Sequence, residues 1–317
     1  MRTITALFVG LGSIGTRHLK NLANLCADRG WTLQADALRS DLTRPLRPGA
    51  AELLHAQYTD LTAAPAHYDM VFITNPTSLH AEALRQVRGR GAALFIEKPI
   101  FSAEQTGLAL DELLPAGQKA YVAAPMRWCG AMLALKELLP ALHPYCARVI
   151  CSSYLPDWRP GVDYRTVYSA RKALGGGVTI DLIHEWDYLV ELFGVPEKLY
   201  NFKGTYSELE IDSDDLSVYI AKYPTLLAEV HLDYFGRGYR RSIELFCRDG
   251  SYLADFGKGT LTLPDGTVQH YEEDVNRRYE REMEYFVDYA LTGCGESCNP
   301  PALALKVLKL TLGENVQ

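Results

Sequence analysis

LFVGLGSIGTRHL, residues 7–19, places an apolar run directly before three glycines at the spacing Gly10-x-Gly12-x-x-Gly15, and a helix-like stretch follows at once. In a strand–turn–helix of this kind one glycine permits the tight turn, the second lets the backbone approach a pyrophosphate, and the third packs the helix on the strand. The helix N-terminus also presents free N–H groups to the phosphates. The alternative is a tight turn with no ligand. The residues expected to bind a dinucleotide here are Gly10, Gly12, Ser13, Ile14 and Gly15.

Strand-like runs alternate with helical patterns as far as Ala124, which predicts a doubly wound parallel sheet with helices on both faces. The strands are expected at Thr5–Val9, Leu33–Leu38, Met70–Thr74, Leu94–Ile96 and Ala120–Ala124. The expected organisation is an α/β chain with a Rossmann domain over residues 1–124 and an α+β domain over residues 125–317.

After Pro125 the pattern changes. Helices are expected near Ala131–Leu139, Val178–Phe193, Asn276–Leu291 and Pro301–Leu312. From about Leu199 onward, strands separated by short turns predict an open-faced, mainly antiparallel sheet in the second domain.

Composition excludes several classes of protein. The formal net charge of −7 gives no basic surface for nucleic acid. The sequence contains no run of 18 or more apolar residues, so no membrane span is predicted. The N-terminus lacks the cleavage pattern of a signal peptide. The seven cysteines form no paired C-x-x-C sets, so we expect reduced thiols, with Cys294 and Cys298 as loop residues and no metal site. These features predict a cytoplasmic protein.

The sequence DALRSDL, residues 36–42, covers the expected end of the second strand, where Rossmann domains contact the adenine ribose. Arg39 and Ser40 stand at that end with Arg44 close by, which favours the 2′-phosphate of NADP. Asp41, or Asp36 if the strand is shorter, could instead bind the ribose hydroxyl of NAD. Arg39 as a plain surface charge is the remaining alternative.

Two further motifs carry groups suited to proton and charge transfer. FIEKPI, residues 95–100, places Lys98 at the end of a parallel strand, where side chains point toward a ligand cleft. In GGGVTIDLIHEWDYLVELFG, residues 175–194, Asp181 and His184 are three residues apart and share the polar side of an expected helix. A histidine beside a carboxylate is suited to general acid–base catalysis, although a solvated helix face would show the same pattern.

Together these motifs resemble the glucose–fructose oxidoreductase/inositol dehydrogenase (Gfo/Idh/MocA) family, and TNPTSLHAEAL, residues 74–84, resembles its segment after the fourth strand. The resemblance implies NAD(P)-dependent oxidation or reduction of a sugar, cyclitol or polyol, in a homodimer or homotetramer formed through the C-terminal sheet. It implies catalytic roles for Lys98, His184 and Asp181, although Asp181 stands one residue closer to the histidine than the family spacing. The further cofactor contacts that it implies are Thr74, Asn75, Pro76, His80, Glu97 and Lys98.

The turn-rich stretch 154–177 leads directly into the helix with His184 and is expected to border the substrate. Its aromatic residues could stack on a sugar ring, and its arginines suit a carboxylate or phosphate, which favours an anionic or nucleotide-activated sugar. A basic surface loop is the alternative. The expected substrate contacts are Arg127, Trp158, Tyr164 and Arg171, together with Lys98, Asp181 and His184.

Two other functions stay open. The chain could hold NAD tightly, oxidise a glycoside transiently to allow elimination, and then reduce the product. It could also be a regulator that binds a dinucleotide without turnover, although such a protein has no need of Lys98 and His184.

Overall fold

The computed structural model describes residues 2–316 and divides the chain into two compact units. The first unit runs to Ala124 and also takes in Tyr279–Leu305, and the second holds Pro125–Arg278 and the residues from Lys306 on. The break after Ala124 coincides with the expected domain boundary. The segment Tyr279–Leu305, which the sequence suggested would stay with the second domain, packs instead with the first.

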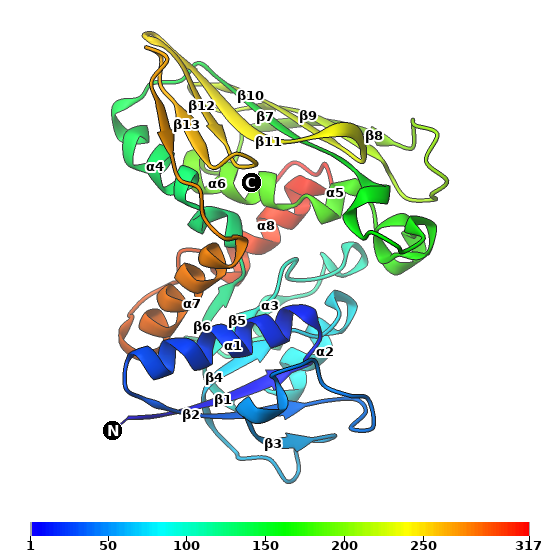
Figure 1. Cartoon of the computed structure of the whole chain (residues 1–317), viewed down its shortest axis with the longest axis vertical. Coiled ribbons are helices and arrows are strands. Elements are labelled where there is room, and N and C mark those ends of the chain that lie inside the picture. The colour runs from blue at the N-terminus through cyan, green and yellow to red at the C-terminus, as the bar shows by residue number, and fades with distance from the viewer. Residues whose placement is uncertain (1, 317) are drawn as a thin grey trace. The chain divides into compact units, whose positions relative to one another are not determined.

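The first unit is built on a six-stranded parallel sheet in the order β3-β2-β1-β4-β5-β6 (Figure 1). The strands are β1 (Thr3–Val9), β2 (Thr32–Leu38), β3 (Leu54–Tyr58), β4 (Tyr68–Ile73), β5 (Gly91–Ile96) and β6 (Lys119–Val122). The helices are α1 (Ser13–Asp28), α2 (His80–Gln86) and α3 (Leu110–Leu113). Because the strand order reverses between β1 and β4, ligands are expected outside the carboxyl ends of these two strands.

Helix α7 (Val275–Thr292) explains why the later segment returns to the first unit. The buried carboxylate of Glu282 accepts hydrogen bonds from the Tyr121 hydroxyl at 2.8 Å and from the Ala124 backbone N–H at 2.6 Å. One turn further along α7, Phe286 packs edge-on against Phe72 and Phe95 in the core. Burial of these aromatic rings contributes roughly 2 kcal/mol each.

The second unit contains an eight-stranded sheet in the order β14-β13-β12-β11-β7-β10-β9-β8. Only the neighbours β7 and β10 are parallel among the paired strands that the structure describes. The strands are β7 (Cys146–Tyr154), β8 (Lys198–Gly204), β9 (Leu216–Lys222), β10 (Leu227–Asp233), β11 (Phe235–Cys247), β12 (Gly250–Asp255), β13 (Thr260–Thr262) and β14 (Val268–His270).

The helices of the second unit, α4 (Gly130–Leu138), α5 (Val178–Asp181) and α6 (His184–Phe193), lie on one face of this sheet and leave its other face open (Figure 1). A last helix, α8 (Pro301–Thr311), ends near β9, where the Tyr219 hydroxyl donates to the Thr311 carbonyl at 2.6 Å. The expected α/β class and the mainly antiparallel second sheet are both confirmed.

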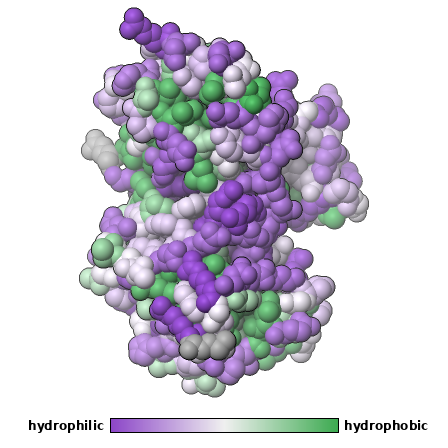
Figure 2. Space-filling model, turned by 60° about the vertical axis from the view of Figure 1, so that its left-hand side comes forward, coloured by the Kyte–Doolittle hydropathy of each residue, from purple (hydrophilic) through white to green (hydrophobic). Residues whose placement is uncertain are grey.

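Within residues 2–316, no helix combines the length and the apolar character that crossing a bilayer requires. The face drawn in Figure 2 is largely hydrophilic, with hydrophobic areas scattered among the polar side chains.

Candidate active site

The three glycines of the β1–α1 turn have three different structural situations. Gly10 has a φ of +89°, and a Cβ there would lie 2.9 Å from the Asn75 backbone. A Cβ on Gly15 would lie 2.6 Å from both the Gly10 carbonyl oxygen and the Thr74 hydroxyl. Gly12 differs, because no heavy atom lies within 4 Å of a Cβ built there. The fold therefore requires Gly10 and Gly15, whereas the bare backbone at Gly12 faces open space.

Helix α1 begins at this open space without a cap. Gly12 is its N-cap residue, no side chain accepts a hydrogen bond from the first turn, and no acidic residue lies in that turn. The first N–H groups of a helix need acceptors, and the helix dipole favours a negative charge at that end. This open N-terminus could hold the pyrophosphate of a nicotinamide dinucleotide, and Ser13 and Ile14 would then supply N–H groups.

The carboxyl end of β4 is fixed against the same turn. The Thr74 hydroxyl donates to the Gly10 carbonyl at 2.6 Å, and the Thr74 N–H donates to the Val9 carbonyl at 3.0 Å. Asn75 packs on Gly10, and Pro76 begins a 3-10 turn, Thr77–Leu79, that leads into α2. Thr74, Asn75 and Pro76 thus lie at the edge of the sheet where the cofactor is expected.

His80 and Glu97 lie beneath this edge. The His80 ring is fully buried, with its Nδ1 3.1 Å from the Ile100 carbonyl and its Nε2 3.1 Å from the Asn75 carbonyl. Glu97 is 7% exposed and lies 2.6 Å from the His18 Nε2. Both side chains are therefore buried and contact the protein itself, His80 through the Asn75 and Ile100 carbonyls and Glu97 through His18. Lys98 is partly exposed, and its ammonium donates no hydrogen bond to any residue that the structure describes.

At the end of β2, the buried carboxylate of Asp36 is already engaged by the protein. It accepts a hydrogen bond from the Tyr68 hydroxyl at 2.7 Å and lies 3.2 Å from His55 Nδ1. Asp41 is partly exposed, and hydrogen bonds from the Thr43 hydroxyl and N–H hold the pKa of its carboxyl below the usual range. Asp36 is thus committed to internal contacts, which leaves Asp41 as the carboxylate that could bind a ribose hydroxyl.

Arg39 and Ser40 follow β2 directly, and Arg39 lines a cavity of about 420 Å³ in the first unit. The Arg39 guanidinium donates to Gln57 Oε1 at 2.7 Å and to the Arg44 carbonyl, which fixes its direction. Arg44 and Arg47 also line the cavity, as does Glu52, and Arg44 Nε lies 3.5 Å from the Asp41 carboxylate. This concentration of arginines can bind a phosphate.

In the second unit the expected helix over 178–193 is divided in two. Asp181 is the last residue of α5, and His184 is the first residue of α6. Leu182 between them has φ −98° and ψ 31°, which interrupts the helix. The apolar periodicity runs across the break, so periodicity did not reveal it.

Asp181 also has a partner that sequence reasoning missed. The hydroxyl of the fully buried Tyr234 donates to Asp181 Oδ2 at 2.6 Å. Burial and the neighbouring Asp181 charge raise the pKa of this phenol well above its usual value, so it stays a donor. A tyrosine at the end of an apolar strand is expected to be a core residue. Nothing in the local sequence predicts the hydrogen bond from Tyr234 to Asp181.

The glycines before Asp181 are required by close packing. A Cβ on Gly176 would collide with the Tyr168 carbonyl. Gly177 has a φ of +135°, and a Cβ there would collide with Asp214. These glycines therefore shape the turn that precedes the catalytic candidates.

The loop 155–174 contains four short 3-10 turns and three of the expected substrate contacts. Trp158 is 39% exposed, donates its indole N–H to the Ser153 hydroxyl at 3.0 Å and packs edge-on against Tyr234. Tyr234 thus links Trp158 to Asp181. Tyr164 accepts the Glu210 N–H at 3.2 Å, and Arg171 is exposed.

Arg127 is placed in the interior. It is 3% exposed and donates to both carboxylate oxygens of Asp187, at 2.8 and 2.9 Å, and to Glu191 at 2.5 Å. Both acidic residues lie on α6, at positions i and i+4. These contacts hold α6 in place. The expected contact of Arg127 with the substrate stays a prediction.

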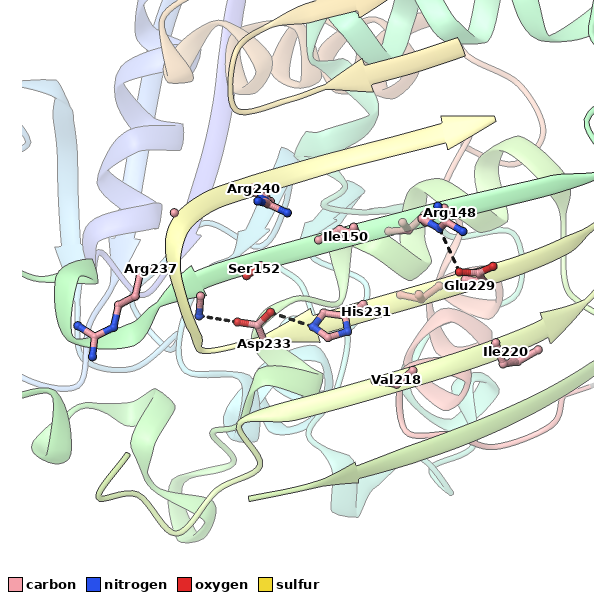
Figure 3. Close-up of a pocket in the computed structure, with 14 residues that line it drawn as sticks. Arg148, Ile150, Ser152, Val218, Ile220, Glu229, His231, Asp233, Arg237 and Arg240 are labelled. Carbon is pink, nitrogen blue, oxygen red and sulfur yellow. Dashed lines mark hydrogen bonds and ion pairs between the residues drawn. The ribbon is translucent and has the colours of Figure 1, made fainter. Parts of the chain in front are cut away.

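The open face of the second sheet carries a groove of about 490 Å³ over β7, β9, β10 and β11 (Figure 3). An Arg148–Glu229 ion pair of 3.1 Å crosses from β7 to β10. Asp233 accepts the Gly236 N–H at 2.7 Å and lies 3.0 Å from His231. The face combines both signs of charge with apolar side chains.

Comparisons with known proteins support the fold and a broad activity. Residues 4–123 match the family model described as "Oxidoreductase family, NAD-binding Rossmann fold". The uncharacterized oxidoreductase YrbE of Bacillus subtilis (strain 168) is 24% identical over 308 residues, which cover 90% of this chain and 86% of the relative. Inositol 2-dehydrogenase of Rhizobium meliloti (strain 1021) is 26% identical over 200 residues, covering 61% of this chain and 56% of the relative.

Among solved structures, the WlbA dehydrogenase from Bordetella pertussis, in complex with NADH and UDP-GlcNAcA, superposes with a TM-score of 0.76 at 17% identity. The alignment covers 98% of this chain and 95% of that one. At this identity the likeness shows the fold, here over both units.

Proposed function

We propose that the chain is an NAD(P)-dependent dehydrogenase or ketoreductase of a sugar or sugar derivative, and the match of residues 4–123 to the Gfo/Idh/MocA model of NAD-binding oxidoreductases supports this proposal. The observation that carries the proposal is the open, uncapped start of α1 at Gly12, framed by two glycines that the fold requires. Because α2, α4 and α6 also lack a side-chain cap and water can satisfy exposed N–H groups, the missing cap supports the proposal only together with the bare backbone at Gly12 and the two close-packed glycines beside it.

The proposed chemistry divides among three residues. When bound, a nicotinamide cofactor supplies the acceptor or donor of hydride. Lys98 holds the developing oxyanion on the reacting carbon with its ammonium, which no described side chain occupies. His184 takes the hydroxyl proton at an imidazole nitrogen during oxidation and returns it during reduction. Asp181, fixed by Tyr234, orients the histidine.

We propose NADP(H) as the preferred cofactor. Asp36 is committed to Tyr68 and His55, and the three arginines beside the end of β2 favour the extra phosphate. Titration with NADPH and NADH of the wild type and of Arg39→Ala tests this preference. We expect the substitution to weaken NADPH binding about tenfold while NADH binding changes little. Equal losses for both cofactors would contradict the assignment.

An anionic or nucleotide-activated sugar is the substrate class that we propose. The exposed Trp158 ring can stack on a sugar, and Arg171 offers a positive charge on an exposed side chain. Turnover is tested with NADP⁺ or NAD⁺ and a panel of myo-inositol, UDP-N-acetylglucosamine and its uronic acid, followed by the absorbance of the reduced nicotinamide. Lys98→Ala and His184→Ala are expected to lower kcat about a hundredfold or more, with Lys20→Ala as the exposed control.

Full turnover in both the Lys98 and the His184 variant would contradict their catalytic roles.

Two other outcomes favour the alternative functions. Cofactor that co-purifies and does not exchange would favour transient oxidation followed by elimination. Exchangeable cofactor binding with no redox chemistry on any sugar tested would favour a regulator.

We further propose that a second copy covers the open face of the second sheet. Ile150 and the 39% exposed Ile220 lie beside the Arg148–Glu229 pair, so the face can complement itself across a twofold axis. Sedimentation of the wild type is expected to give a dimer or larger oligomer, and Ile220→Arg is expected to shift it toward monomer. A monomeric wild type at micromolar concentration would contradict this.

A further inference from the structure

Two buried histidines hold the ends of the segment that carries Lys98. His18, on α1, contacts the Glu97 carboxylate immediately before the lysine. His80, on α2, contacts the Ile100 carbonyl two residues after it. Both rings are 0% exposed, so neither can contact solvent or a ligand directly. The loop is therefore anchored from two helices on either side of Lys98.

The contact between His18 and Glu97 is short, buried and directional. His18 Nε2 lies 2.6 Å from Glu97 Oε1, and the other carboxylate oxygen accepts the Lys98 backbone N–H at 3.1 Å. Phe95 packs against the histidine ring with 4.7 Å between centroids, which limits its rotation. Burial opposes ionisation of Glu97, but the hydrogen bond and charge from His18, with the charge of Lys98, hold the pKa of the carboxyl below its usual range.

A buried carboxylate needs donors; Lys98 carries the one ammonium in residues 95–100, and its charge already acts on Glu97. We propose that His18 is a positioning residue for Lys98: by donating its Nε2–H to Glu97, it keeps that carboxylate from capturing the lysine ammonium. Lys98 then remains available to an oxygen of the substrate. The catalytic meaning of this inference rests on the proposed function, but the contact itself does not.

The proposal is tested on the full chain without cofactor or substrate. Limiting acetic anhydride labels lysines in proportion to their free amine, and mass spectrometry reads the labelling rate of Lys98 against that of Lys20. In His18→Leu we expect Lys98 to react about threefold more slowly, the size of one partly exposed ion pair, because Glu97 now holds it. His18→Gln retains an N–H donor and is expected to restore the rate. His67→Leu, an exposed histidine of the same unit, is the matched control.

A double-mutant cycle identifies the route. If His18 acts through Glu97, His18→Leu has no further effect on Lys98 labelling in a Glu97→Gln background. An unchanged rate in a folded His18→Leu variant, or a slowing that persists without the carboxylate, would overturn the proposal. If the leucine variant does not fold, His18→Asn replaces it, because this shorter amide keeps a donor that falls short of Glu97. The labelling experiment needs neither cofactor nor turnover. Failure of the His18 proposal can therefore be distinguished from failure of the proposed function.

Discussion

The paired substitutions Gly12→Ala and Gly15→Ala separate the part of the β1–α1 turn that the fold needs from the part that a ligand needs. A methyl group on Gly15 would lie 2.6 Å from two oxygens, one of them on the backbone. Overpacking of this kind costs roughly 1–3 kcal/mol, and alanine recovers up to about 1 kcal/mol as a better helix former. We therefore expect Gly15→Ala to lower the free energy of unfolding by about 1–2 kcal/mol.

Gly12→Ala should do the opposite. Its φ of −72° suits alanine, and no heavy atom lies within 4 Å of the new methyl group. The free energy of unfolding is expected to change by less than about 0.5 kcal/mol. The methyl group would occupy the space where the pyrophosphate approaches the backbone, so NADPH affinity should fall at least about tenfold, or about 1.4 kcal/mol.

Urea unfolding and fluorescence titration with NADPH measure the two effects on the same samples. Wild-type NADPH affinity in Gly12→Ala would refute the placement of the pyrophosphate. Wild-type stability in Gly15→Ala would refute the packing argument for the third glycine.

Three further predictions concern buried polar contacts. Arg127→Met leaves two carboxylates of α6 without their guanidinium and should cost about 3–5 kcal/mol in urea unfolding; a loss under 1 kcal/mol would contradict the bracing role. The pKa of Glu97 is lowered in the fold, so ionised Glu97 stabilises the native state at pH values above its ordinary pKa of 4.5. This stabilisation is lost as the pH falls below 4.5 and through the lowered pKa. Glu97→Gln should therefore lose less stability between pH 6 and about 3.5 than the wild type, whereas the exposed control Glu104→Gln should match the wild type. Tyr234→Phe removes a donor to Asp181 and should cost about 1 kcal/mol of stability; an unchanged unfolding midpoint would show that the hydrogen bond contributes nothing.

The first unit could be predicted closely because its signals are local. Glycine spacing, an apolar strand and a helical pattern all lie within residues 7–19, and the observed roles of Gly10 and Gly15 follow from that spacing. Strand β3 was missed because its sequence, LHAQY, has alternating exposed residues and little apolar character, as suits an edge strand.

What could not be predicted depends on contacts distant in sequence. Tyr279–Leu305 belongs with the first unit because Glu282 and Phe286 find partners far earlier in the chain. The ion pairs of Arg127 could not be foreseen because its partners lie 60 and 64 residues away on α6, and its role toward the substrate stays a prediction. The break at Leu182 was hidden by an uninterrupted apolar period.

The central claim is that this chain binds a nicotinamide dinucleotide at the open start of α1. Calorimetric titration of the purified wild type with NADPH and with NADH tests it most directly. Saturable binding at one site per chain, tighter for NADPH and weakened in Gly12→Ala, is the predicted result. Absence of binding by either cofactor, in protein that carries none from purification, would contradict the account.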